Sequence, residues 1–125
     1  MLPWNRKSRL LVLEDDPSMQ KLVSTLLRRA GHATDVVGDA AQAIEKLEGR
    51  AYDGFLLDIM TPTTGGMTVI RHLRESKPEL LKRVVLVTAS PESVLKGVSG
   101  DVFAIVRKPF SPEQLIETIE RLVAS

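Results

Sequence analysis

Acidic residues follow two short apolar runs of the sequence, where they could bind a metal. Glu14, Asp15 and Asp16 follow the first run, and Asp58 ends a later one. Two unit charges about 4 Å apart repel by about 4 kcal/mol at an effective dielectric constant near 20. Carboxylates that folding draws together therefore need protonation or a divalent cation with oxygen ligands. Because Mg²⁺ suits carboxylates, waters and a phosphoryl oxygen, the pattern predicts metal-assisted phosphoryl chemistry.

Three further positions could act in that chemistry. Asp58 stands alone at the end of its run, beside a loop rich in Thr, Pro and Gly, and a carboxylate can attack phosphorus to form an acyl phosphate. The hydroxyl of Thr88 can donate a hydrogen bond to a phosphoryl oxygen, and Lys108 can bind phosphate as a positive charge. We expect the backbone carbonyl of Met60 to complete the coordination of the metal.

The elements that must position these residues alternate along the chain. Short, continuous apolar runs rich in β-formers are typical of strands buried on both faces. The predicted strands are 10–13, 33–37, 52–58, 84–88 and 102–106. An apolar stripe of helical period follows each of them, and the helix after the fourth strand is expected to be short, ending near Gly97.

Capping residues mark several of these helices. Asp16 is the expected N-cap of the first helix, with Pro17 as its first residue and Gly31 after its end. The N-terminal dipole of that helix is an alternative explanation for the acids before it. Asp39 with Gln42 resembles a capping box at the second helix.

Five β–α units predict a doubly wound α/β domain with a parallel sheet, because right-handed crossovers place helices on both faces. Ligand sites in such sheets lie beyond the carboxyl ends of the strands. If the first and third strands are neighbours, Glu14, Asp15 and Asp58 converge there. The pattern alone leaves the strand order open.

Composition bounds the remaining function classes. The chain has 125 residues, 43% of them hydrophobic and 26% charged, which suits one globular domain. A net charge of +1 gives no general attraction to nucleic acid or membrane, and the basic helix faces lack interleaved aromatic residues. The absence of cysteine excludes disulfides and thiolate metal sites and suits the cytosol. We expect neither a membrane span nor a signal peptide.

The motifs together resemble a response-regulator receiver domain over about residues 8–124. The resemblance rests on the stretches 11–17, 52–62, 65–66, 87–89 and 108–110, each of the main motifs standing at a strand end. It implies a flavodoxin-like (βα)5 fold with strand order 2-1-3-4-5, and a cis bond between Lys108 and Pro109. The whole of 1–125 is then expected to be a single receiver domain with an N-terminal tail at 1–8, located in the cytoplasm.

The resemblance also implies a function. Asp58 would accept a phosphoryl group from a sensor histidine kinase or a histidine phosphotransfer protein. Glu14 and Asp15 would be the acidic pair that binds Mg²⁺, Thr88 the switch hydroxyl and Lys108 the phosphate-pairing lysine. Such a domain is a signalling module that catalyses only its own phosphorylation and slow dephosphorylation. Phosphorylation would switch partner binding, or self-association through the face of the fourth and fifth strands and the last helix.

Some residues depart from the family pattern. Ile105 stands where the family often has an aromatic side chain whose rotation couples to the threonine, and Gly65 replaces a frequent aspartate. His32 and His72 are predicted to be ordinary surface residues rather than phosphoryl carriers.

Two other function classes suit the sequence less well, and the extent of the protein is open. An aspartyl-phosphate phosphohydrolase typically carries a second aspartate two residues after its nucleophile, where this chain has Met60. A flavodoxin needs a hydroxyl-rich phosphate loop after the first strand, where this chain has three acids. The chain could also be a stand-alone receiver or a fragment of a longer regulator.

Overall fold

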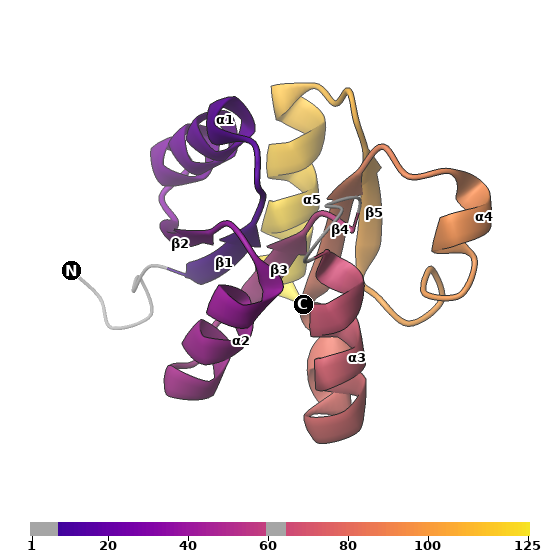
Figure 1. Ribbon diagram of the computed structural model, residues 1–125. Coiled ribbons are helices and arrows are strands. Elements are labelled where there is room, and N and C mark those ends of the chain that lie inside the picture. Colours follow the sequence, from indigo (N-terminus) through magenta and orange to yellow (C-terminus); the bar gives the residue numbers. More distant parts are fainter. Residues whose placement is uncertain (1–7, 60–64) are drawn as a thin grey trace.

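The predicted strands form one parallel sheet in the computed structural model, which describes residues 8–59 and 65–125. The strands are β1 (Arg9–Leu13), β2 (Ala33–Val37), β3 (Gly54–Leu57), β4 (Val84–Thr88) and β5 (Ala104–Arg107). Their order is β2-β1-β3-β4-β5, which confirms the expected doubly wound topology (Figure 1). The register pairs Leu13 of β1 with Leu57 of β3, so these two strands end side by side.

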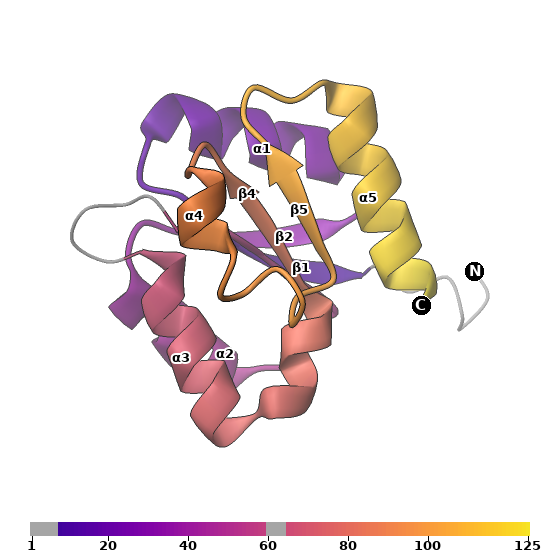
Figure 2. The ribbon, with the colours of Figure 1, turned by 90° about the vertical axis from the view of Figure 1, so that its right-hand side faces the viewer.

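Helices cover both faces of the sheet. They are α1 (Pro17–Arg29), α2 (Ala40–Gly49), α3 (Gly66–Ser76), α4 (Glu92–Leu95) and α5 (Pro112–Ala124), with a 3-10 helix, η2, at Pro78–Arg83. One apolar core lies between the sheet and α1 with α5, and the other between the sheet and α2, α3 and α4. Figure 2 shows β5 at the edge of the sheet with α4 on one side and α5 on the other. In the described part of the chain, no helix is long and apolar enough to cross a membrane.

The predicted caps are confirmed. The Oδ2 of Asp16 accepts a hydrogen bond from the Met19 N–H at 2.8 Å, and Pro17 is the first residue of α1. The Oδ1 of Asp39 accepts one from the Gln42 N–H, also at 2.8 Å. Gly31 follows α1 with a φ of 99°, a left-handed conformation that glycine adopts without strain.

Four local features differ from the expectations. The third strand spans only Gly54–Leu57, and the last strand begins at Ala104, two residues later than predicted. The 3-10 helix η2 was not predicted, because its proline marks the end of α3 but does not by itself indicate a new helical turn. Leu22, in the predicted apolar stripe of α1, is 44% exposed.

The prediction that both histidines lie on the surface is wrong for His32. This residue is 6% exposed, and its Nε2 lies 2.9 Å from a carboxylate oxygen of Glu120 on α5. A ring nitrogen that has a polar partner can be buried at little cost. The sequence does not reveal that Glu120 is this partner for Nε2. His72 is partly exposed and lies 2.9 Å from Glu48.

Candidate functional site

The carboxyl ends of β1 and β3 bring the predicted acidic residues together. Glu14 follows β1 and Asp58 follows β3, and the Asp58 N–H donates to the carbonyl of Leu13 at 3.2 Å. One carboxylate oxygen from each of Glu14, Asp15 and Asp58 lies within 4.8 Å of the others. Glu14 and Asp58 are buried, whereas Asp15 is exposed. The predicted convergence of the three carboxylates is therefore present.

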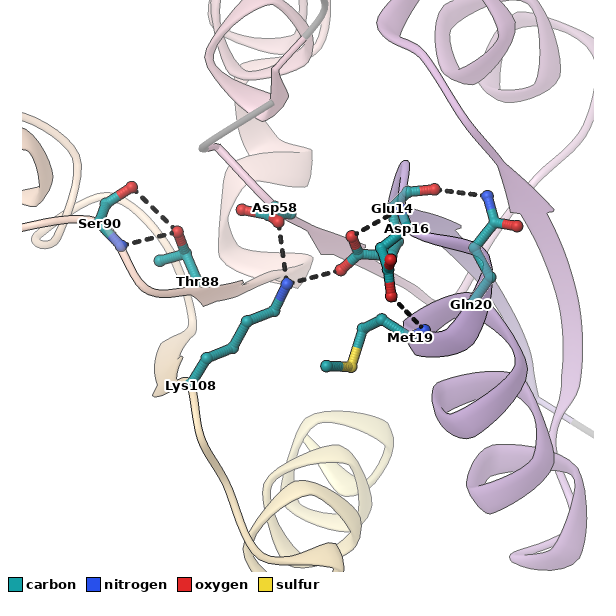
Figure 3. Close-up of polar contacts among 8 residues, drawn as sticks. All are labelled: Glu14, Asp16, Met19, Gln20, Asp58, Thr88, Ser90 and Lys108. Carbon is teal, nitrogen blue, oxygen red and sulfur yellow. Dashed lines mark hydrogen bonds and ion pairs between the residues drawn. The ribbon is translucent and has the colours of Figure 1, made fainter. Parts of the chain in front are cut away.

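Lys108 extends from the end of β5 into this cluster (Figure 3). Its Nζ lies 2.7 Å from Oε1 of Glu14 and 2.9 Å from Oδ2 of Asp58. The backbone of Lys108 is fixed by a hydrogen bond from its N–H to the Thr88 carbonyl, and the Lys108–Pro109 bond is cis, as expected. Burial by itself lowers the pKa of Lys108, but hydrogen bonds to Glu14 and Asp58 outweigh it and raise that pKa. The lysine is therefore held in its charged form.

The charges of the cluster suit a divalent cation. Three carboxylates face one ammonium group, which leaves an excess of negative charge when all are ionised. The donors are hard carboxylate oxygens, the ligand type that Mg²⁺ prefers, and the exposed Asp15 leaves access for water ligands. These residues fit a magnesium ion. The expected carbonyl ligand, Met60, lies outside the described residues.

Hydrogen bonds around Glu14 separate its role from that of Asp16. The Asp16 N–H donates to Oε2 of Glu14 at 3.2 Å, and Gln20 Nε2 donates to the Glu14 carbonyl. The Asp16 carboxylate instead caps α1 by accepting from Met19. The backbone of Asp16 therefore orients the Glu14 carboxylate, while its side chain caps the helix.

Gly66 fixes the backbone of Asp58 from the other side. Its N–H donates to the Asp58 carbonyl at 2.8 Å. A Cβ at this position would lie 3.0 Å from Cβ of Leu57 and 3.1 Å from the Asp58 carbonyl oxygen. Only glycine lets α3 begin this close to the end of β3.

Thr88 lies at the end of β4 and is fully buried. Its hydroxyl is 2.9 Å from the hydroxyl of Ser90 and accepts a hydrogen bond from the Ser90 N–H at 3.1 Å. Figure 3 shows Thr88 turned toward Ser90, while Lys108 bridges Glu14 and Asp58. The sequence indicates Ser90 only as the start of a helix, and the sole signal for a wider role is its place two residues after Thr88.

Ile105, the residue in place of the family's aromatic side chain, lies on β5. It is partly buried and packs against the core shared by α2, α3 and α4. An aliphatic side chain there offers no hydroxyl and no ring to pair with Thr88.

Comparison with known proteins identifies the family. A family model described as the response regulator receiver domain matches residues 10–120. The DNA-binding response regulator MtrA of Mycolicibacterium smegmatis is 33% identical over 115 residues, which cover 90% of this chain and 49% of MtrA. This chain thus spans about half the length of the curated relatives it matches.

Solved structures agree with this assignment. The response regulator TrrA of Thermotoga maritima, in complex with Mg²⁺ and beryllium fluoride, has 27% identity and a TM-score of 0.81 over 92% of this chain and 98% of its own. A sensor protein from Polaromonas has 28% identity and a TM-score of 0.82 over 95% of this chain and 98% of its own. The match decides against the flavodoxin and phosphohydrolase alternatives. The chain belongs to the response regulator receiver domain family of two-component signalling.

Proposed function

We propose that Asp58 accepts a phosphoryl group from the phosphohistidine of a sensor histidine kinase or a histidine phosphotransfer protein. The observation that carries this proposal is the ammonium group of Lys108, which lies 2.7 Å from Glu14 and 2.9 Å from Asp58 in one buried site. An ammonium group held between two carboxylates can bind the oxygens of a phosphoryl group that is transferred to one of them. We further propose that residues 1–125 act as a single receiver domain with a tail at 1–8.

Asp58 is the best nucleophile among the three acids. Glu14 accepts hydrogen bonds from Lys108 and the Asp16 N–H, and it lies in the segment that leads into α1. Asp15 is exposed, which suits a ligand that shares a metal with water. Asp58 follows the central strand β3, and Gly66 fixes its backbone carbonyl, so its carboxylate is held on a rigid support.

Glu14, Asp15 and Asp58 would hold Mg²⁺, with the Met60 carbonyl as a proposed fourth protein ligand. A bound Mg²⁺ neutralises charge on the phosphoryl oxygens during in-line transfer. Lys108 would bind one of those oxygens, and the Thr88 hydroxyl would donate to another after leaving Ser90. The magnesium and beryllium fluoride complex of the related TrrA supports this ligand chemistry for the family.

Phosphorylation would then act as a switch rather than as a step in metabolism. The added charge shifts an equilibrium between two arrangements of the face formed by β4, β5 and α5. That face would bind a partner or a second copy of the chain. Curated relatives such as MtrA are DNA-binding response regulators, and in this proposal the receiver domain controls such an output without touching nucleic acid.

A single-turnover labelling experiment tests the acceptor. The wild type, Asp58→Asn and Asp101→Asn are each incubated with Mg²⁺ and a phosphohistidine-bearing kinase domain, or with phosphoramidate as a small P–N donor. Asp101 is an exposed control far from the site, paired with Arg74 on the surface. We expect acid-stable, base-labile labelling of the wild type and Asp101→Asn, and none of Asp58→Asn. Equal labelling of all three proteins would reject Asp58 as the acceptor.

A further inference from the structure

Thr88 and Ser90 form a closed pair of hydroxyl groups beside the proposed acceptor site. Both residues are fully buried, so water does not replace either partner. The two side-chain hydrogen bonds of Thr88 both lead to Ser90, one to its hydroxyl at 2.9 Å and one from its N–H at 3.1 Å. A threonine hydroxyl has one proton and two acceptor lone pairs, so these contacts use most of its bonding capacity.

We propose that Ser90 is a positioning residue that holds the Thr88 hydroxyl in the unphosphorylated arrangement. The inference rests on the proposed function, because it matters only if Thr88 must donate to a phosphoryl group on Asp58. Either hydroxyl of the pair can be the donor, so in both cases the Thr88 hydroxyl has to turn away from the Ser90 hydroxyl before it can face a phosphoryl group on Asp58. The Ser90 hydroxyl therefore competes with the phosphoryl group for the Thr88 hydroxyl. The strength of the Ser90–Thr88 contact sets how readily the domain is activated.

The position of Ser90 also explains how release of Thr88 reaches the surface. Ser90 immediately precedes Pro91, the N-cap of α4, and the Thr88–Ser90 contact joins the end of β4 to that helix. Ile105 on the neighbouring strand offers no hydroxyl or ring to take over this coupling. The hydroxyl pair is thus a polar link between the end of β4 and the start of α4.

Beryllium fluoride, a phosphoryl mimic, tests the proposal with Mg²⁺ in excess. Ser90→Ala removes the competing hydroxyl but keeps the backbone N–H, so we expect it to bind beryllium fluoride about fivefold more tightly than the wild type, or about 1 kcal/mol. Without Mg²⁺ or beryllium fluoride, the same variant should lose a similar amount of stability in urea. Ser90→Cys, which places a weak thiol donor at the same point, should shift affinity in the same direction.

A double-mutant cycle separates positioning from packing. In a Thr88→Val background the hydroxyl pair is already broken, so adding Ser90→Ala should leave both beryllium fluoride affinity and urea stability unchanged. Equal effects in both backgrounds would mean that Ser90 acts through packing alone and would overturn the proposal. Unchanged or weaker binding by Ser90→Ala and Ser90→Cys in the Thr88 background would overturn it too. A wild type that does not bind beryllium fluoride would instead reject the proposed acceptor site, while the urea cycle would still report on the Thr88–Ser90 pair.

Discussion

Replacing Lys108 by methionine should destabilise the domain and make its stability depend more strongly on magnesium. Methionine keeps an unbranched apolar stem but removes the ammonium group that lies 2.7 Å from Glu14 and 2.9 Å from Asp58. Removing one partner of a buried ion pair costs about 3–5 kcal/mol, because the other charge is left uncompensated. The Lys108 side chain is 18% exposed, which places the loss at the low end, about 3 kcal/mol.

Mg²⁺ should restore much of that loss, since a ligand that binds only the folded state adds about 2.7 kcal/mol at a hundred times its dissociation constant. The ion replaces Lys108 as the counter-charge, so it should stabilise Lys108→Met more than the wild type. Urea unfolding followed by circular dichroism, with and without millimolar MgCl₂, measures both effects. Lys82→Met, which changes an exposed lysine on η2, is the control and should shift stability by less than about 0.5 kcal/mol. A loss below about 1 kcal/mol in Lys108→Met, or equal stabilisation of both proteins by Mg²⁺, would contradict the reasoning.

Substitutions at three further positions test the surrounding elements. Asp16→Ala should cost about 1 kcal/mol in urea by removing the N-cap of α1, whereas Asp16→Asn should stay within a few tenths. Gly54→Ala should lower the free energy of unfolding by about 1–3 kcal/mol, because a Cβ there would lie 2.5 Å from Cδ2 of Leu122. A melting temperature equal to that of the wild type would show that Leu122 on α5 moves aside without cost. Burial and the hydrogen bond to Asp35 raise the pKa of Tyr52 from 10.0 to about 12. The free energy of unfolding that this shift contributes, about 1–2 kcal/mol, is present below pH 10 and is lost as the pH rises toward 12. Between pH 9 and 12, the free energy of unfolding of Tyr52→Phe should therefore fall less steeply than that of the wild type. Equal slopes for the two proteins would refute the role of Tyr52.

The convergence of the acidic residues could be predicted because their positions directly after apolar strands can be read from the sequence. Strands buried on both faces are apolar throughout, so a carboxylate or lysine directly after one stands out. The carboxyl ends of parallel strands share one edge of the sheet, which brings Glu14, Asp58 and Lys108 together once the strand order is known. That order came from the resemblance to a family, since apolar pattern alone does not say which strands pair.

Other features depend on tertiary contacts that leave no local pattern. His32 looks like a turn residue after Gly31, and only the position of Glu120 on α5 makes its burial favourable. Ser90 looks like the start of a helix, and its pairing with Thr88 depends on how the chain turns after β4. In each residue one polar atom pairs with one particular partner, Nε2 of His32 with Glu120 and the hydroxyl of Ser90 with Thr88, and such partners are found only in the folded arrangement.

We expect the folded domain to carry one magnesium-dependent phosphoryl acceptor, Asp58. Hydride reduction of an acyl phosphate to an alcohol records its position permanently, because the modified aspartate becomes homoserine. The intact chain is phosphorylated with phosphoramidate in the presence of Mg²⁺ or of excess chelator, reduced with borohydride and sequenced by mass spectrometry. We predict homoserine at position 58 in the magnesium sample and none in the chelated one. Homoserine at position 15 or 16, or equal amounts of homoserine in both samples, would rule out Asp58 as the magnesium-dependent acceptor.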